Sequence, residues 1–191
     1  MAWEPAFGQD LEWTLLHALS RLGREDGESA YFRLSTRPLD QSLHTGTREE
    51  VLAGGYRLRS PEAPGVAIAV IGALVPEALA AADVLAEEAG IAAEVICVTS
   101  ADLLFRSFQA RAGLADGDPA LVDRLFPHGA PIVTLLDGHP HTLAFLGALG
   151  SGIACLGVQR FGQSGDIGEL YEHHQIDAES VVGAALDLLD G

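Results

Sequence analysis

One short segment carries three side chains that could bind a metal ion. Asp137, His139 and His141 come directly after an apolar run that predicts a strand, and histidines two residues apart in an extended segment can point the same way. No fourth ligand stands at an obvious spacing, and Pro140 is typical of a plain turn. Two interpretations stay open: a metal-dependent enzyme that uses Asp137, His139 and His141, or a polar loop at a subunit surface.

A serine and two histidines later in the chain are candidates for nucleophilic catalysis. In the sequence 162–165, however, Gly165 stands directly after Ser164, whereas a nucleophile elbow has its glycine two residues after the serine. His173 and His174 are expected on the next helix and point about 100° apart, so at most one of them could reach Ser164. We therefore expect Ser164 to cap a helix. The two histidines are expected either to face a partner or to bind carbonyl groups at the helix end.

A small ligand could also bind where several strands end. Gly72, Ser100 and Asp137 each come after an apolar run that predicts a strand. In open parallel sheets, ligands bind outside the carboxyl ends of the strands. A stand-alone α/β module that binds a small ligand or a partner at this edge is therefore another interpretation. The single glycine at position 72 favours a tight turn over a phosphate-binding loop, and Ser100 is also expected to cap a helix.

Predicted strands and helices alternate through most of the chain. Strands separated by helices pair in parallel through right-handed crossovers. We therefore predict an α/β fold, a three-layer sandwich with a mainly parallel sheet of about five strands. The strands are expected at 55–59, 66–71, 93–99, 131–136 and 153–158, and the helices at 76–89, 101–111, 120–125, 143–149 and 178–189.

The first 50 residues have a different pattern. A helix with one apolar face is expected at 11–22 and a strand at 30–35, and this unit cannot bury its apolar surface alone. It either docks on the rest of the chain or is the tail of another domain. Residues 36–50 are polar, rich in turn residues and without periodicity, which predicts a linker.

The charge of the chain excludes two classes of partner. Its 191 residues include 11 basic and 27 acidic side chains, for a formal net charge of −16, so it repels nucleic acid and anionic membranes. No apolar run reaches the ~18 residues that span a bilayer, and no signal peptide is apparent, so we expect a cytoplasmic protein. Cys97 and Cys155 lie in expected strands and are predicted to be small buried hydrophobic residues.

Several motifs occur together in an order that is familiar from one enzyme family. Arg160-Phe161-Gly162-Gln163-Ser164-Gly165 precedes a short helix, the sequence Ile176-Asp177-Ala178-Glu179-Ser180-Val181-Val182 and an Ala/Leu-rich helix. This order resembles the C-terminal domain of the transketolase superfamily. The pair His173-His174 ahead of Ile176-Asp177-Ala178 looks most like the homodimeric type of pyruvate dehydrogenase, the thiamine-dependent decarboxylating component.

The N-terminal part agrees with this resemblance, and three other segments depart from it. Trp3-Glu4-Pro5-Ala6-Phe7 and Tyr31-Phe32-Arg33-Leu34-Ser35-Thr36 are similar to the family's junction between its middle and last domains. The turn Gly72-Ala73-Leu74 stands where the family usually has a Gly/Ser-rich turn, and Asp137-Gly138-His139-Pro140-His141 matches no motif of the family. Gly117-Asp118-Pro119 does not make the Gly-Asp-Gly metal–diphosphate motif of the family's first domain.

The resemblance implies a division of the chain and a function. Residues 1–35 would be the helix–strand tail of the preceding middle domain, 36–54 a linker, and 55–191 the transketolase C-terminal-like domain. The chain would then be a non-catalytic structural and assembly region of a thiamine-dependent 2-oxo-acid (pyruvate) dehydrogenase component, inactive alone. Thiamine diphosphate and Mg²⁺ are implied for the parent enzyme and not for this chain. Its implied partners are the thiamine-binding domains, a second copy in a dimer and the lipoyl acyltransferase component.

Overall fold

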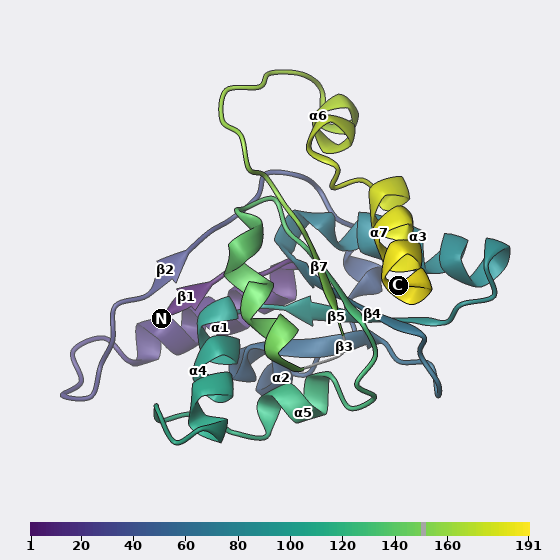
Figure 1. Cartoon of the computed structure of the whole chain (residues 1–191). Coiled ribbons are helices and arrows are strands. Elements are labelled where there is room, and N and C mark those ends of the chain that lie inside the picture. The colour runs from purple at the N-terminus through teal and green to yellow at the C-terminus, as the bar shows by residue number, and fades with distance from the viewer. Residues whose placement is uncertain (150–151) are drawn as a thin grey trace.

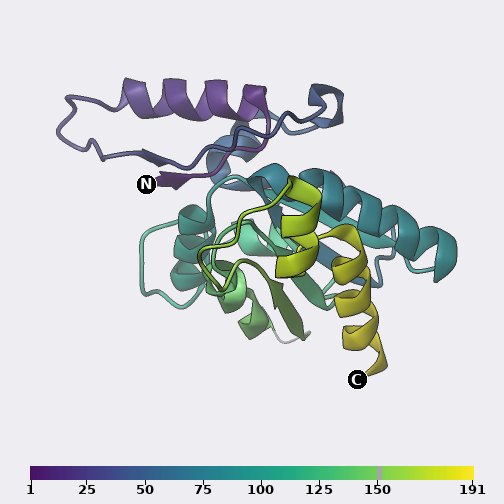
Figure 2. The same ribbon diagram turned by 90° about the horizontal axis from the view of Figure 1, so that it is seen from above.

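The protein consists of an N-terminal segment (residues 1–47) that lies along one side of an α/β body (residues 48–191), as Figures 1 and 2 show. The computed structural model describes residues 1–149 and 152–191. The segment contains a helix, a two-stranded parallel sheet and a short 3₁₀ helix, namely β1 (Ala2–Trp3), α1 (Gly8–Ser20), β2 (Tyr31–Phe32) and η1 (Gln41–Leu43). No helix in the described ranges is long and apolar enough to cross a membrane.

The α/β body is built on a five-stranded sheet in the order β3-β5-β4-β6-β7. The four neighbours β5, β4, β6 and β7 pair in parallel, and the edge strand β3 is antiparallel to β5. This arrangement confirms the predicted α/β class and its mainly parallel sheet. The strands are β3 (Gly55–Arg59), β4 (Val66–Ile71), β5 (Ala93–Val98), β6 (Ile132–Leu135) and β7 (Ile153–Leu156).

Helices cover both faces of the sheet, which gives the three layers. One face carries α3 (Val75–Glu88) and α7 (Ala178–Asp190); the other carries α4 (Ala101–Arg111), α5 (Leu121–Leu125) and the 3₁₀ helix η3 (Pro140–Leu149). The remaining elements of the body are α2 (Arg48–Ala53), the 3₁₀ turn η2 (Gly72–Leu74) and α6 (Ile167–His174).

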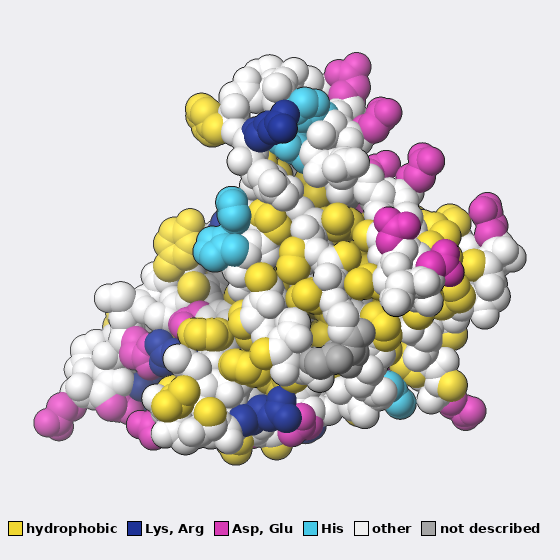
Figure 3. All heavy atoms as spheres, viewed as in Figure 1, with side chains coloured by type: hydrophobic (Ala, Val, Ile, Leu, Met, Phe, Trp, Pro, Cys, Tyr) yellow, Lys and Arg dark blue, Asp and Glu magenta, His cyan; other side chains and the backbone are white. Residues whose placement is uncertain are grey.

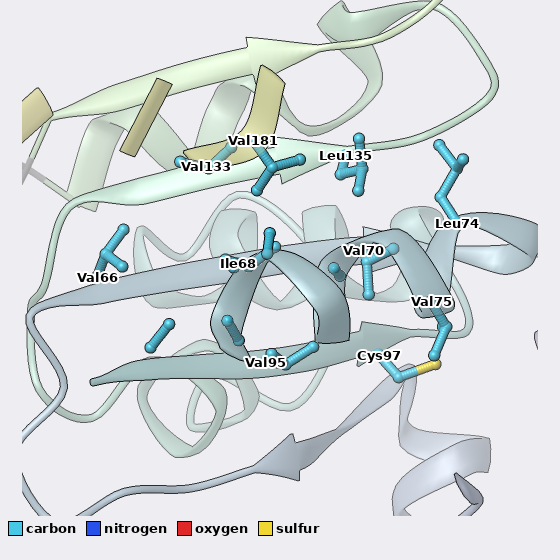
Figure 4. Close-up of a cluster of buried hydrophobic side chains, with 14 of the residues drawn as sticks. Val66, Ile68, Val70, Leu74, Val75, Val95, Cys97, Val133, Leu135 and Val181 are labelled. Carbon is cyan, nitrogen blue, oxygen red and sulfur yellow. The ribbon is translucent and has the colours of Figure 1, made fainter. Parts of the chain in front are cut away.

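The central strand β4 shows why the sheet needs cover on both faces. Its six residues are all buried, and they alternate between two hydrophobic clusters because successive side chains of a strand point to opposite faces. Val66, Ile68 and Val70 belong to the cluster beneath α3 and α7, where they meet residues such as Val181 (Figure 4). Ala67, Ala69 and Ile71 belong to the cluster on the other face.

A buried polar cluster joins the N-terminal segment to the α/β body. The carboxylate of Asp10 on α1 accepts hydrogen bonds from Phe7 N (3.2 Å) and from the hydroxyl of Tyr56 on β3 (3.3 Å), and it lies 2.9 Å from His44 Nε2. Asp10 and Tyr56 are buried, and the rings of Phe7, Trp13 and Tyr56 pack edge-on against His44. Burial raises the pKa of Asp10, although each of these partners opposes the shift.

Local structure in the first 54 residues differs from the prediction. Helix α1 begins at Gly8 and not at Leu11, because the Asp10 carboxylate binds the Phe7 N–H and closes the first turn earlier. The strand predicted at 30–35 is reduced to β2. The region 36–54 is only partly irregular: Thr47 and Glu50 form a capping box that starts α2, and Val51 is buried. The domain boundaries after residues 35 and 54 stay a prediction.

The two cysteines are free thiols in different settings. Cys97 on β5 is buried in the core, as predicted, and burial raises the pKa of its thiol. Cys155 on β7 was expected to be buried as well, but it is only half-buried because β7 is an edge strand.

Candidate functional site

The carboxyl ends of β4, β5, β6 and β7 all lie at one edge of the sheet, as parallel pairing requires. Ligands of such sheets bind there, and the candidates Ser100 and Asp137 both lie at this edge. The N-terminal segment, however, takes up much of the edge, as the contacts of Ser100, Asp137 and the Gly72 turn show.

Ser100 serves the fold through both functions of its hydroxyl. Its Oγ accepts from Leu103 N (3.2 Å), which confirms the predicted cap of α4, and the same hydroxyl donates to Ala2 O (2.6 Å) on β1. Glu4 N also donates to Thr99 O (2.8 Å). Ser100 is fully buried beneath the N-terminal segment, so its hydroxyl is not exposed to a ligand.

Asp137 is bound by an arginine from the N-terminal segment. Arg33 Nη1 lies 2.5 Å from Asp137 Oδ1, and Arg33 Nη2 donates to the backbone O of Asp137 (3.1 Å). Glu4 Oε2 accepts from the same guanidinium group at 3.1 Å. Burial raises the pKa of Glu4, and the charge and hydrogen bond of Arg33 oppose that rise. The Asp137 carboxylate thus fixes the N-terminal segment to the end of β6.

A second arginine covers the turn after β4. Arg37 Nη1 donates to Ala73 O (3.1 Å), Arg37 Nη2 donates to Glu77 (3.0 Å), and the guanidinium group lies 5.2 Å from the centre of the Tyr171 ring. The turn at Gly72 is therefore capped by the protein itself. Neither Arg33 nor Arg37 was a candidate from the sequence, and their spacing of four residues in an otherwise base-poor chain was the only available signal.

The structure brings His139 and His141 together but does not join Asp137 to them. The two Nδ1 atoms lie 2.7 Å apart, and both residues are exposed. Asp137 instead engages Arg33. Across residues 1–149 and 152–191, no group of three or more His, Cys, Asp or Glu side chains is placed to hold a metal ion. The three-ligand metal site considered from the sequence is not formed.

Ser164 does not cap the helix after it, contrary to the prediction. Asp166 takes that role, because its Oδ1 accepts from Glu169 N (3.0 Å) at the start of α6. His173 and His174 stand in the last turn of α6 with their rings edge to face. The carbonyl groups at this helix end are bound by Gln175 N and Ile176 N, so the two histidines are not needed there.

Part of the carboxyl edge stays open at β6 and β7. A hollow of about 600 Å³ lies between the loop after β6 and the loop after β7. Four candidate residues from the sequence line it: Asp137, His139, Ser164 and His174, the last of which is half-buried. His141 and His173 do not line it. In the described part of the chain, no hydrogen bond joins Ser164 to a histidine, so a serine–histidine catalytic pair is not formed.

One protein family matches most of this chain. The family model described as "Transketolase-like TK C-terminal domain" matches residues 54–177, well over half of the chain. The chain belongs to this family. The resemblance to the transketolase superfamily is thereby confirmed, and residues 160–177 of its most specific stretch, 160–182, lie inside the matched range.

Individual relatives extend the similarity to the N-terminal segment. A chromosomal transketolase from Cupriavidus necator is 32% identical over 188 residues, which covers 98% of this chain and 26% of the relative. A pyruvate dehydrogenase E1 component from Mycolicibacterium smegmatis is 30% identical over 201 residues, covering 97% of this chain and 22% of the relative. The chain spans about a quarter of the length of these relatives. The narrower likeness to pyruvate dehydrogenase is not supported over transketolase.

Solved structures of transketolases share this fold. A transketolase from Pichia stipitis superposes with a TM-score of 0.73 at 22% identity, covering 99% of this chain and 25% of that chain. A split-gene transketolase, described as an "inactive beta4 tetramer", superposes with a TM-score of 0.69 at 19% identity. The match covers 99% of this chain and 57% of that chain. The N-terminal segment is therefore part of the shared architecture, and not an addition to it.

Proposed function

We propose that this chain is a non-catalytic structural and assembly region of a thiamine-diphosphate-dependent enzyme of the transketolase type. One observation carries the proposal: helix α1 turns its apolar face away from the protein. Its buried residues are the polar Asp10 and Thr14, whereas Leu15, Leu16 and Leu19 are 42%, 53% and 53% exposed.

A helix on the surface of a protein normally packs its apolar face against the core, and α1 has the opposite orientation. Leu22, just after the helix, is 65% exposed, and Leu34 and Tyr31 of the same segment are 55% and 63% exposed. Figure 2 shows α1 as the outermost element on its side of the molecule. Contiguous apolar side chains on a surface are typical of a contact with another protein or domain. The occupant we propose is the set of thiamine-binding domains of the parent enzyme.

We propose that thiamine diphosphate and Mg²⁺ are not held by the described residues. Asp118 of Gly117-Asp118-Pro119 accepts from Arg124 (2.6 Å) and from Ala120 N (3.0 Å), and these bonds hold its pKa below the usual range. No cluster of metal-binding side chains exists in the part of the chain that the structure describes. The cofactor and its carbanion chemistry therefore belong, in this proposal, to domains outside residues 1–191.

The reaction of the parent enzyme is proposed from its relatives. Two transketolases from Cupriavidus necator, one chromosomal and one plasmid-borne, are 32% and 30% identical to this chain and support ketol transfer. The alternative is a pyruvate dehydrogenase component, which is favoured by His173-His174 before Ile176-Asp177 and by the 30% identical E1 relative. Only that alternative would make a lipoyl acyltransferase a partner. For either parent enzyme, a cytoplasmic location and a dimer stay predictions.

The stand-alone binding module is less well supported than assembly. Its expected site around Gly72, Ser100 and Asp137 is occupied by Arg37, by β1 and by Arg33, all from the N-terminal segment. Because the protein's own N-terminal segment occupies this edge, a ligand cannot bind there in the same way. Binding of a small ligand at this edge stays open only for the hollow at the ends of β6 and β7.

A charge-insertion experiment tests the assembly proposal. The chain would be mixed with a protein that carries the two thiamine-binding domains from the same organism, and the complex measured by size-exclusion chromatography with light scattering. The double variant L16E and L19E should weaken the complex about 30-fold to 100-fold, because two half-exposed leucines contribute about 2–3 kcal/mol when buried.

The matched control is L114E, because Leu114 is 75% exposed in the loop after α4 and lies outside the N-terminal segment. It should assemble like the unmodified chain, and far-UV circular dichroism should show that all variants fold. Assembly of the double variant with unchanged affinity would contradict the proposal, and so would the absence of any complex with the unmodified chain.

A further inference from the structure

The open hollow at the ends of β6 and β7 has the size and position of a small-molecule site. Its volume of about 600 Å³ lies within the range of ligand pockets, and it opens at the carboxyl edge of adjacent parallel strands. Figure 1 shows that the loop after β7 and helix α6 project from the α/β body at this place. The loop after β6 forms the opposite wall.

A close backbone contact holds the base of the hollow together. Val158 N donates to Gly138 O (2.9 Å), which joins the two loops just beyond their strands. A Cβ atom at position 157 would lie 2.6 Å from Gly138 O and 2.9 Å from Pro140 N, so only glycine allows this approach. Beyond this contact the two loops separate, and the space between them is the hollow.

Arg160 brings to the hollow a positive charge that has no carboxylate partner among the described residues of this strongly acidic protein. Most arginines here are neutralised by a carboxylate within 4 Å, namely Arg21, Arg33, Arg37, Arg59, Arg106, Arg111 and Arg124. Within the described ranges, Arg160 has no such carboxylate. Arg160 and His174 line both this hollow and a smaller adjoining one of about 230 Å³.

Two acidic residues of this region have partners of their own. Asp137, the one acidic residue among the described residues that line the hollow, is paired with Arg33, and Asp166 is engaged at the start of α6. In Figure 3 the side chains at the top of the molecule separate by charge: an Arg side chain lies against His side chains, and Asp and Glu side chains lie to their right.

His139 lines the opposite wall of the hollow. Its Nδ1 accepts from His141 N (3.3 Å) and lies 2.7 Å from His141 Nδ1. A neutral His139 with an accepting Nδ1 carries its proton on Nε2, which leaves an N–H for a ligand. The hydroxyl of Ser164 also lines the hollow.

We propose that this hollow binds a small phosphate-bearing anion, held by Arg160 with His139, His174 and Ser164 around it. A guanidinium group binds phosphate oxygens in pairs, and histidine and serine donors complete the contacts. A single arginine with neutral donors suits one phosphate group better than a long polyanion. The site is distinct from the apolar face of α1 and does not depend on assembly with other domains.

The test is an NMR titration of the unmodified chain with inorganic phosphate, and separately with pyrophosphate and acetate, at constant ionic strength. Phosphate should produce saturable shifts confined to the amides of residues 138–141, 157–164 and 174. The variant R160Q should weaken binding about tenfold or more, and H139Q by a smaller factor. Arg160 is exposed, so its replacement should leave the fold intact.

The matched control is R24Q, because Arg24 is another exposed arginine without a carboxylate within 4 Å in the described part of the chain, and it lies outside the hollow. It should bind phosphate like the unmodified chain. Shifts that do not saturate, or an equal loss in R160Q and R24Q, would overturn the proposal. Acetate binding as tight as phosphate binding would overturn its phosphate specificity.

Discussion

Replacing Asp10 with alanine should loosen the N-terminal segment from the α/β body. The substitution removes the acceptor of the Phe7 N–H and of the Tyr56 hydroxyl, and both groups are buried. Loss of the helix-capping bond to Phe7 costs about 1 kcal/mol, and an unpaired buried hydroxyl costs about 1–3 kcal/mol. We expect D10A to lower the free energy of unfolding by about 2–4 kcal/mol, a large share of the about 5–15 kcal/mol of a typical domain.

The tryptophans make this loss easy to assign to the N-terminal segment. The chain has two, Trp3 and Trp13, and both lie in that segment, with the ring of Trp13 5.6 Å from that of His44. Urea unfolding would be followed by tryptophan fluorescence and by far-UV circular dichroism, which is dominated by the helices of the α/β body. In D10A the fluorescence transition should shift to lower urea than the circular dichroism transition.

A second substitution separates the hydrogen bond from packing. Y56F keeps the ring against His44 and removes one donor to Asp10, so it should cost about 1 kcal/mol. The double variant D10A and Y56F should be less destabilised than the two single losses added together, because no hydroxyl is then left unpaired. A loss below about 0.5 kcal/mol in D10A, or additive losses in the double variant, would refute the role of this cluster.

Two further predictions concern buried groups of the α/β body. Glu94 on β5 is 1% exposed with no hydrogen-bond partner in the described part of the chain, and burial raises its pKa despite the opposing charges of His128 and Arg57. Because this pKa is raised in the folded state, the contribution of Glu94 to stability is most favourable below about pH 4.5 and is lost as pH rises. The variant E94Q should therefore raise the free energy of unfolding by about 1 kcal/mol or more at neutral pH, and by little in acid. A gain that does not change with pH would contradict this. G157A should destabilise the protein by about 1–3 kcal/mol in urea unfolding, because its Cβ would collide with Gly138 O. G183A on α7 should instead stabilise it by about 0.5–1 kcal/mol, because no atom lies within 4 Å of a Cβ at that position. Equal effects of the two variants would contradict the close contact at position 157.

Most of the α/β body could be predicted from local sequence. Continuous apolar runs such as Val66–Ile71 predict buried strands, and the short strand β3 has the predicted bounds, 55–59. The missed helix α2 had a local signal as well, since Thr47 and Glu50 have the spacing of a capping box. The prediction of the N-cap of α6 was wrong because Ser164 and Asp166 are both residue types that cap helices well. The backbone conformation decides between them, and sequence alone does not reveal it.

The candidate site was predictable in place but not in its contacts. Parallel strands fix which edge holds Ser100 and Asp137, so the edge can be deduced from the order of the elements. The partner of Asp137 is Arg33, 104 residues away in sequence, and no spacing rule connects them. The exposed apolar face of α1 was equally hidden, because its periodicity predicts a helix whichever way that helix turns.

The most direct test of the account is a ketol-transfer assay of this chain with thiamine diphosphate and Mg²⁺, alone and mixed with the thiamine-binding domains. Calorimetry with the same cofactor and metal would be run on the chain alone. We predict no activity and no Mg²⁺-dependent cofactor binding for the chain alone, and activity in the mixture that falls in parallel with assembly in the L16E and L19E variant. Activity or Mg²⁺-dependent cofactor binding by the chain alone would contradict the claim that it is a non-catalytic assembly region.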